Sequence, residues 1–464
     1  MGPASLVANL KQAFEGKTLP LQIFTDNLKT CLSHPDELFL ALAFRIGFFI
    51  PAKVPLDSPN YIFCEDMLQK VSRSFALVIR VLPNSLRISV CIFYLILRAL
   101  DTIEDDMARF EGKQQTKIQL LRGFSKRLSQ PNWGLFSIGQ GDEKLLLEEF
   151  HKVLSVFHTL SKEDQRILTN TCERMGNGMA DFVEKQIRLG TESKEEYNLY
   201  CHYVAGLVGQ GLTELFVAHG FEDPSLLLLT KEANEMGLFL QKVNIVRDYL
   251  EDLQEGRTFW PRDIWKKYGE TLLDLRTGDK EKSLQCLNEL VIDAYSHVPA
   301  CLRYLEKIKN PQVFKFCAIP QIMALATLER LVNNVDVFSG VVKIRKGLMF
   351  SLFQHTESIE EVKGIVSTYS EAILANIPVH HQAHKLAIPL VYEVQGMCVD
   401  GIQPQKPWPS LVSFLFSLSI LMYAFFQKGN RRWMDLLLVA VLSIFMIFKK
   451  SAALSSKIWT KHLP

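Results

Sequence analysis

The chain has 464 residues, of which 48% are hydrophobic, and a formal net charge of +2 at pH 7. This length is ample for a large core, and the near-neutral balance, without a basic stripe interleaved with aromatics, gives no indication of nucleic-acid binding. The nine cysteines stand singly, without C-x-x-C pairs or zinc-finger spacing, and no apolar signal sequence opens the chain. Together these features indicate a reducing, cytosol-facing environment.

The first part of the chain divides into a leader and a long helical region. Residues 1–33 are weakly patterned and are interpreted as a variable leader. Over residues 34–375 the pattern is helical, convincing strand alternation is absent, and glycine and proline fall mostly between the periodic runs. The sequence therefore predicts an all-α domain at 34–375. Within it, the more polar stretch 111–145 is expected to contain a long loop.

A helix is predicted across residues 94–106, and it carries the acidic pattern Asp-x-x-Glu-Asp at Asp101, Glu104 and Asp105. Positions i, i+3 and i+4 share a helix face, so the three carboxylates project together, with Tyr94 and Arg98 before them on that face. Like charges at this spacing repel one another. Leucine and isoleucine fill the other faces, which indicates a buried helix.

The same acidic pattern returns about 150 residues later, at the end of a second apolar helix. One copy alone is most often a solvated helix face. Buried charges, however, must be paired or bind a metal, and magnesium takes oxygen ligands from carboxylates and substrate phosphates. The two copies therefore predict a magnesium site lining an internal cavity, with the second set of polar residues being Gln241, Asn244, Asp248, Glu251 and Asp252.

Between the two acidic patterns lies the segment 200–211, which contains Gly206, Gly209 and Gly211. The last two do not form a dinucleotide-binding loop, because no strand precedes them and the third glycine is missing. Each glycine inside a helix costs about 1 kcal/mol against alanine. Either a bulky group lies against this helix or two helices pack closely, and the spacing leaves both explanations open. Tyr203, on the same stretch, is either a packed aromatic or a proton-handling phenol.

The C-terminal quarter changes character twice. A basic patch at Lys343, Arg345 and Lys346 is either a phosphate site or a solvated basic loop. Residues 376–409 contain prolines and histidines and are predicted to be a linker. Two apolar runs follow at 411–426 and 436–448, each shorter than the roughly 20 residues of a full span. With aromatic and basic residues near their ends, they predict a membrane anchor at 410–450, as one tilted span or a shallow hairpin, before a basic tail at 451–464.

Several of these motifs occur in a fixed order that resembles the squalene/phytoene synthase family, in particular its squalene-forming members. The resemblance covers roughly residues 34–375 plus the hydrophobic tail. It rests on Ser72–Phe75, Tyr94–Asp106, the Tyr203 segment, Gln241–Asp252, Gly256–Pro261, Phe316–Pro320 and Val342–Gly347.

The resemblance implies a single all-α isoprenoid-synthase domain around a central cavity. It also implies that two farnesyl diphosphates condense head to head to presqualene diphosphate, which NADPH then reduces to squalene in sterol biosynthesis, with magnesium as the metal. The residue roles that it implies are catalysis for Tyr203, Phe75, Phe316 and Tyr94, substrate binding for Ser72, Gln241 and Asn244, and cofactor binding for Arg73, Arg98, Arg247, Lys343 and Arg345.

Further expectations concern partners and alternatives. A monomer is expected, held on the endoplasmic reticulum membrane by its tail, with the catalytic domain facing the cytosol. The nearest alternative is a presqualene diphosphate synthase or a phytoene-synthase-like enzyme without the reductive step. A distant alternative is a membrane-tethered, cation-binding scaffold without catalysis, which would not need Tyr203, paired metal clusters and an apolar cavity together.

Overall fold

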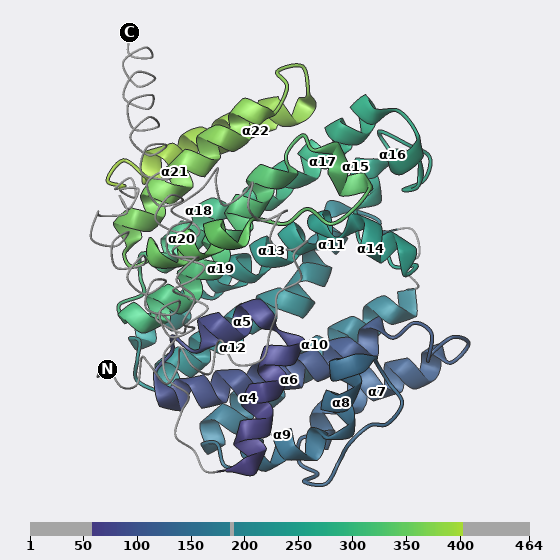
Figure 1. Cartoon of the computed structure of the whole chain (residues 1–464), viewed down its shortest axis with the longest axis vertical. Helices are drawn as coiled ribbons and strands as arrows, with labels where there is room; N and C mark the ends of the chain where they lie inside the picture. The colour runs from purple at the N-terminus through teal and green to yellow at the C-terminus, as the bar shows by residue number, and fades with distance from the viewer. Residues whose placement is uncertain (1–57, 186–189, 402–464) are drawn as a thin grey trace, which may run out of the picture. The chain divides into compact units, whose positions relative to one another are not determined.

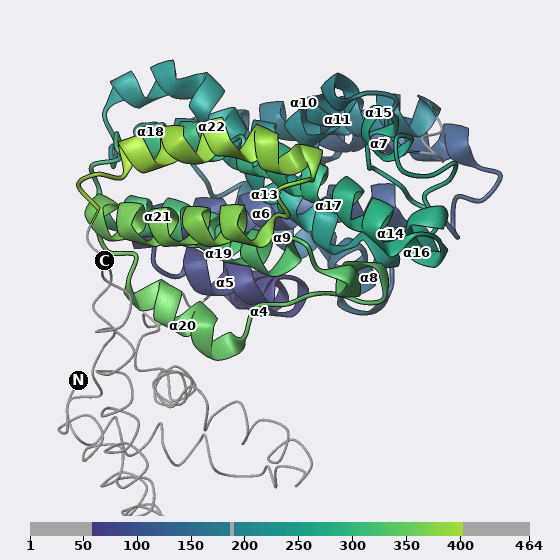
Figure 2. The same cartoon turned by 90° about the horizontal axis from the view of Figure 1, so that it is seen from above.

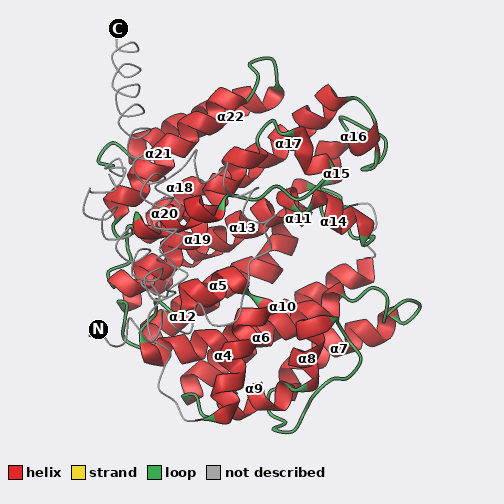
Figure 3. Ribbon diagram, viewed as in Figure 1, coloured by secondary structure: helices red, strands yellow, loops and turns green. Residues whose placement is uncertain are grey.

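The computed structural model describes residues 58–185 and 190–401, and every regular element in these ranges is a helix (Figures 1 and 3). The all-α prediction is therefore confirmed for the described part of the chain. The predicted leader, membrane anchor and basic tail lie outside it. The α-helices are α4 (Pro59–Val71), α5 (Arg73–Ile79), α6 (Asn84–Asp105), α7 (Gln114–Arg127), α8 (Gly141–Glu148), α9 (Phe150–Phe157), α10 (Lys162–Lys185), α11 (Lys194–Cys201), α12 (Leu207–Ala218), α13 (Thr230–Arg247), α14 (Tyr249–Gln254), α15 (Arg262–Trp265), α16 (Asp274–Thr277), α17 (Lys280–Tyr295), α18 (Val298–Leu305), α19 (Pro311–Leu331), α20 (Lys346–Gln354), α21 (Ile359–Asn376) and α22 (Gln382–Met397).

Three shorter helical turns complete the set: the π-helical turn η1 (His202–Gly206) and the 3₁₀ turns η2 (Pro224–Leu229) and η3 (Val335–Phe338). Several helices begin at side-chain caps that the local sequence supplies. Ser193, Asp279, Asn310 and Ser358 each accept a hydrogen bond from a backbone N–H of the first turn that follows. Such caps satisfy donors that have no partner within the helix.

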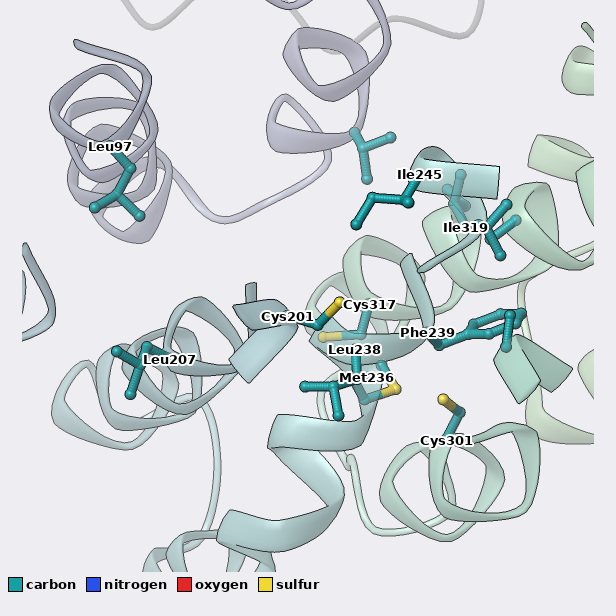
Figure 4. Packing of buried hydrophobic residues seen from close by; sticks show 14 of the residues in the cluster. Leu97, Cys201, Leu207, Met236, Leu238, Phe239, Ile245, Cys301, Cys317 and Ile319 are labelled. Atoms are coloured by element: carbon teal, nitrogen blue, oxygen red, sulfur yellow. The ribbon is translucent and has the colours of Figure 1, made fainter. Parts of the chain in front are cut away.

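Helix α13 is the central element, because α12, η1, α17, α18 and α19 all pack around it. Figure 1 shows α13 and α19 between the N-terminal helices α4 to α10 and the C-terminal pair α21 and α22. Figure 2 shows the same helices from above. Figure 4 shows part of the core between them, where apolar side chains such as Met236 and Phe239 of α13 are buried. A helix surrounded in this way must be apolar on most faces.

The prediction of a long loop at 111–145 is wrong for the first half of that stretch, most of which forms α7. Ile118, Leu121 and Phe124 recur at helical spacing on α7 and are buried, and α7 packs along α10. Within 111–145, the residues outside helices are 111–113 and 128–140. The polar residues that suggested a loop instead form the solvent-facing side of an amphipathic helix.

The linker expected at 376–409 is also corrected, because α22 lies within it. This helix buries Ala383, Ala387, Val391 and Val394 and packs against α17, α18 and α21. Its spacing of apolar residues is helical, but it is short enough to be hidden by the prolines and histidines around it. Within the ranges that the structure describes, no helix is both long and apolar enough to cross a membrane.

Candidate active site

Three residues of the polar row predicted on the first acidic helix line a cavity of about 250 Å³, whereas Glu104 and Asp105 do not. Tyr94, Arg98 and Asp101 come from α6, and Gln241 and Asn244 come from α13. Apolar side chains of α5, α6, α12, α13 and α19 form most of the remaining wall; they include Ile79, Phe93, Leu97, Val208, Leu212, Phe216, Met236, Leu240, Phe316 and Cys317. The cavity is therefore apolar with one polar side, a form suited to an amphipathic ligand.

Arg98 organises the polar side of the cavity. Its Nη2 donates a hydrogen bond to the Tyr94 hydroxyl at 3.0 Å, and its Nη1 lies 3.8 Å from Asp101 Oδ2 and 3.7 Å from Glu143 Oε1. Burial raises the pKa of Asp101 to about 7, although Arg98 opposes that rise. The carboxylate is therefore incompletely compensated, and an additional cation would stabilise its charged form.

The second acidic pattern does not lie on one uninterrupted helix. Helix α13 ends at Arg247 and α14 begins at Tyr249, with Asp248 between them, although the Asp252 N–H still donates to the Asp248 carbonyl at 3.0 Å. Arg247 donates two hydrogen bonds to the Asp248 carboxylate, at 2.8 and 2.6 Å. Glu251 is exposed, whereas burial raises the pKa of Asp252 to about 7.

The two acidic clusters meet at Arg257, a residue to which the sequence analysis assigned no role. Its guanidinium donates to Asp105 of the first cluster and, at 3.2 Å, to Asp252 of the second. It also donates to Glu255 at 2.8 Å. Asp105 and Arg257 are 152 residues apart in sequence, so helical spacing could not reveal the contact. The available signal was the position of Arg257 three residues after the second acidic helix ends.

The carboxylates at the ends of α6 and α14 supply oxygen atoms, which are the ligand type that magnesium takes. Burial and the neighbouring Asp105 and Asp101 raise the pKa of Glu104 to about 8, so a bound cation would favour its charged form. Hard divalent cations take such oxygen ligands. The prediction of an internal acidic cavity is corrected in one respect, since Asp105 and Glu251 are exposed; the clusters lie where the cavity side meets solvent.

Three of the four residues expected to act on the reacting substrate line the cavity. The Phe75 and Tyr94 rings lie 5.9 Å apart between centroids. Phe316, which is buried, makes an edge contact with Phe216 at 6.0 Å. The rings of these three residues border the apolar part of the cavity.

Tyr203, the fourth, is next to the cavity but is not among the residues that line it; its neighbours Val204 and Ala205 are. It lies in the π-helical turn η1, where the sequence predicted a regular helix. A Cβ built on Gly178 of α10 would lie 2.1 Å from Tyr203 Cγ, so the ring packs directly on the α10 backbone. Single π-helical turns occur frequently at functional sites.

The glycines of this segment are explained by close helix packing rather than by a bulky ligand. A Cβ on Gly206 would lie 2.0 Å from Asn234 Oδ1, and one on Gly209 would lie 2.1 Å from the Ala233 carbonyl oxygen. On the facing helix α13, a Cβ on Gly237 would lie 2.2 Å from the carbonyl oxygen of Ala205. Glycine permits this close backbone approach.

The remaining predicted residues whose side chains the structure describes lie outside the cavity lining. Ser72 is buried between α4 and α5. Arg73 begins α5, and its side chain is outside the described part of the structure. Lys343 is exposed and Arg345 is partly buried, in the non-helical segment that leads into α20. The structure therefore does not bring Lys343 and Arg345 into the lining.

An all-helical fold around an apolar cavity, with two acidic clusters at its polar side, defines an isoprenoid-synthase fold. The solved structure of TcSQS with a bound ligand has this fold, with a TM-score of 0.71 and 41% sequence identity, and the match covers 74% of this chain and 100% of that chain. The described helices thus share their overall fold with that structure.

The family model described as squalene/phytoene synthase matches residues 68–347. The chain is 42% identical to the squalene synthase of Rattus norvegicus over 403 residues, which are 85% of this chain and 95% of that protein. It is 44% identical to the Homo sapiens squalene synthase over 353 residues, which are 75% of this chain and 83% of that protein. It is 47% identical to the Candida albicans squalene synthase over 353 residues, which are 74% of this chain and 78% of that protein. The chain belongs to the squalene/phytoene synthase family.

Proposed function

We propose that the cavity binds two farnesyl diphosphates, condenses them head to head to presqualene diphosphate, and reduces this intermediate with NADPH to squalene. Squalene synthase activity in sterol biosynthesis is the activity of the relatives from rat, human and Candida albicans, and it is the activity of this chain. The observation that carries the finer proposal is the meeting of two acidic clusters at the polar side of an apolar cavity. Prenyl chains are apolar, whereas diphosphates are anionic and need cations.

The six carboxylates of Asp101, Glu104, Asp105, Asp248, Glu251 and Asp252 would hold magnesium. When bound, magnesium neutralises the leaving diphosphate and so assists its departure. Arg98 and Arg247 would add charge-assisted hydrogen bonds to phosphate oxygens. Both arginines now pair with cluster carboxylates, and a metal bound to those carboxylates would release the guanidinium groups for the diphosphate.

Departure of one diphosphate leaves an allylic cation, which the double bond of the second farnesyl diphosphate attacks. Phe75, Phe316 and Tyr94 present aromatic faces to this cation, where cation–π attraction is worth up to about 2 kcal/mol when water is excluded. A proton must then leave to close the cyclopropane ring, and we assign its removal to Tyr203. A phenol hydroxyl is a poor base, so the freed diphosphate is the group that activates it.

The reductive step needs a hydride donor, and the proposed NADPH contacts are Lys343 and Arg345, together with Arg73, Arg98 and Arg247. Lys343 and Arg345 immediately precede the N-terminus of α20, and helix N-termini favour phosphate groups. In this step the second diphosphate leaves, the cyclopropane ring rearranges and opens, and the hydride adds to the resulting allylic cation, which yields squalene. Ser72, Gln241 and Asn244 are assigned to substrate, and the latter two line the cavity.

The membrane assignment concerns residues outside the described structure. The apolar runs at 411–426 and 436–448, with basic residues beside them, support an anchor at 410–450 on the endoplasmic reticulum, with the catalytic domain on the cytosolic side. A membrane position suits an enzyme that releases a water-insoluble hydrocarbon. The proposed form is a monomer.

The roles of Tyr203 and Arg345 are tested by separating the two half-reactions. Tyr203→Phe keeps the ring and removes the hydroxyl, so the variant should bind substrate, make no presqualene diphosphate, and still reduce presqualene diphosphate that is supplied to it. Arg345→Ala should lose a charge-assisted contact worth roughly 1.5–3 kcal/mol and accumulate the intermediate. The measurement is lipid product analysis of both variants with each substrate.

Tyr392→Phe is the matched control, because Tyr392 is 73% exposed on α22, and its products should be unchanged. Normal squalene formation from farnesyl diphosphate by Tyr203→Phe would remove the proposed base. An unchanged dependence on NADPH concentration in Arg345→Ala would remove the cofactor contact.

A further inference from the structure

The contact between the acidic clusters is made by a protein cation. Arg257 reaches three carboxylates with one guanidinium: Asp105 at the end of α6, Asp252 on α14, and Glu255 directly after α14. Its side chain is 19% exposed. A planar guanidinium can serve several acceptors at once, which a lysine ammonium cannot do with the same geometry. Arg257 therefore fills the position between the clusters with one positive charge.

This arrangement offsets a repulsion that the fold creates. The ends of α6 and α14 bring carboxylates from two distant parts of the chain close together, and burial disfavours their charged forms. A cation between them is needed to hold both helix ends in place. The turn that supplies it is local to the second cluster: Gly256 adopts a φ of 72°, and the Arg257 N–H donates to the Asp252 carbonyl at 2.8 Å.

The same position is the one that a divalent cation shared by the two clusters would occupy. An ion between Asp105 and Asp252 needs the space in which the guanidinium now lies, and it repels the guanidinium charge. The Arg257 Nε–H is buried and has no hydrogen-bond partner in the described part of the chain. The side chain thus has donor capacity that its three carboxylates do not use, and a phosphate oxygen could accept from it.

We propose that Arg257 is an internal counter-cation, which holds the two acidic clusters together before metal binds and gives up Asp105 and Asp252 when divalent cations enter. The inference rests on the proposed metal site and adds a positioning residue to it. It makes metal entry an exchange of cations rather than the filling of a vacant site. Its consequence is that the protein binds metal alone weakly, because the guanidinium competes for the same carboxylates.

The test is binding of Mn²⁺ alone to the full chain in detergent, measured by electron paramagnetic resonance, without substrate. Arg257→Gln should bind Mn²⁺ roughly tenfold more tightly than the unaltered protein, because a neighbouring like charge acts strongly through a low effective dielectric. Without metal, the same variant should unfold at a lower temperature. Mn²⁺ should raise its unfolding temperature by more than it raises that of the unaltered protein.

Two further variants separate direct competition from general charge. Arg257→Lys keeps the charge but cannot donate to the three carboxylates together. Its Mn²⁺ affinity should therefore lie between that of the unaltered protein and that of Arg257→Gln. Arg262→Gln removes a nearby guanidinium that pairs with Glu192, outside the clusters, and it should bind Mn²⁺ like the unaltered protein. Unchanged or weaker binding by Arg257→Gln, or equal gains in Arg257→Gln and Arg262→Gln, would overturn the inference and leave the metal site intact. Absence of Mn²⁺ binding in the unaltered protein and in every variant would overturn both the proposed role of Arg257 and the proposed metal site.

Discussion

Alanine at position 178 is expected to destabilise the fold next to the proposed base. Gly178 lies in α10 against the Tyr203 ring, and a Cβ there would lie 2.1 Å from Cγ, 2.4 Å from Cδ1 and 2.6 Å from Cδ2. Optimal contacts between carbon atoms are about 3.5–4.0 Å, so the ring would have to retreat by more than one ångström. Rotation of the ring does not relieve the clash, because Cγ lies on the rotation axis. Either the Tyr203 rotamer or the π-helical turn must therefore move.

The size of the effect follows from two opposing contributions. Replacing glycine by alanine inside a helix gains about 1 kcal/mol, whereas overpacking a tight interior typically costs about 1–3 kcal/mol and sometimes more. Since three ring atoms overlap with the added methyl group, the overpacking cost should lie at or beyond the upper end. We expect a net loss of about 2 kcal/mol in the free energy of unfolding.

Gly123→Ala is the matched control, because Gly123 lies inside α7 and a Cβ there would meet nothing within 4 Å. This variant should gain up to about 1 kcal/mol. Denaturant unfolding gives both values, and product analysis at a temperature where both variants are folded should show reduced presqualene diphosphate formation in Gly178→Ala alone. A Gly178→Ala variant as stable as Gly123→Ala would refute the packing argument.

Two further predictions concern the carboxylates and the C-terminal helix. Because burial raises the pKa of Asp101 and Asp252 to about 7 and the pKa of Glu104 to about 8, the folded metal-free protein keeps protons that the unfolded chain loses near pH 4. Stability from these groups should therefore fall as the pH rises from about 4 to about 8, and magnesium should restore it at pH 8; equal unfolding temperatures with magnesium and with a chelator at that pH would contradict this. A chain ending after Gly401 retains α22 and should unfold at a higher temperature than one ending after Asn376, which exposes the apolar surface under α22. Equal unfolding temperatures for the two truncations would mean that α22 adds no stability.

Features that depend on neighbours along the helix could be predicted from the sequence. Tyr94, Arg98 and Asp101 share a face because of the helical repeat, and the structure confirms that they line one cavity together with Gln241 and Asn244. The all-α class follows in the same way from periodicity, and the order of the motifs indicated the family that the comparisons confirm.

Features that depend on partners far apart in sequence could not be predicted in this way. The contact of Arg257 with Asp105 spans 152 residues, and no periodic pattern encodes it. The choice between ligand space and helix packing at Gly206 and Gly209 depended on Asn234 and Ala233 across the interface. Helices α7 and α22 are stabilised by burial against other helices. The polar residues of α7, and the prolines and histidines in and around α22, therefore misled a prediction based on local pattern. Local spacing decides which side chains share a helix face, whereas tertiary packing decides what each face contacts. The reason is that most of the free energy that stabilises a helix in a folded protein comes from contacts between separate parts of the chain.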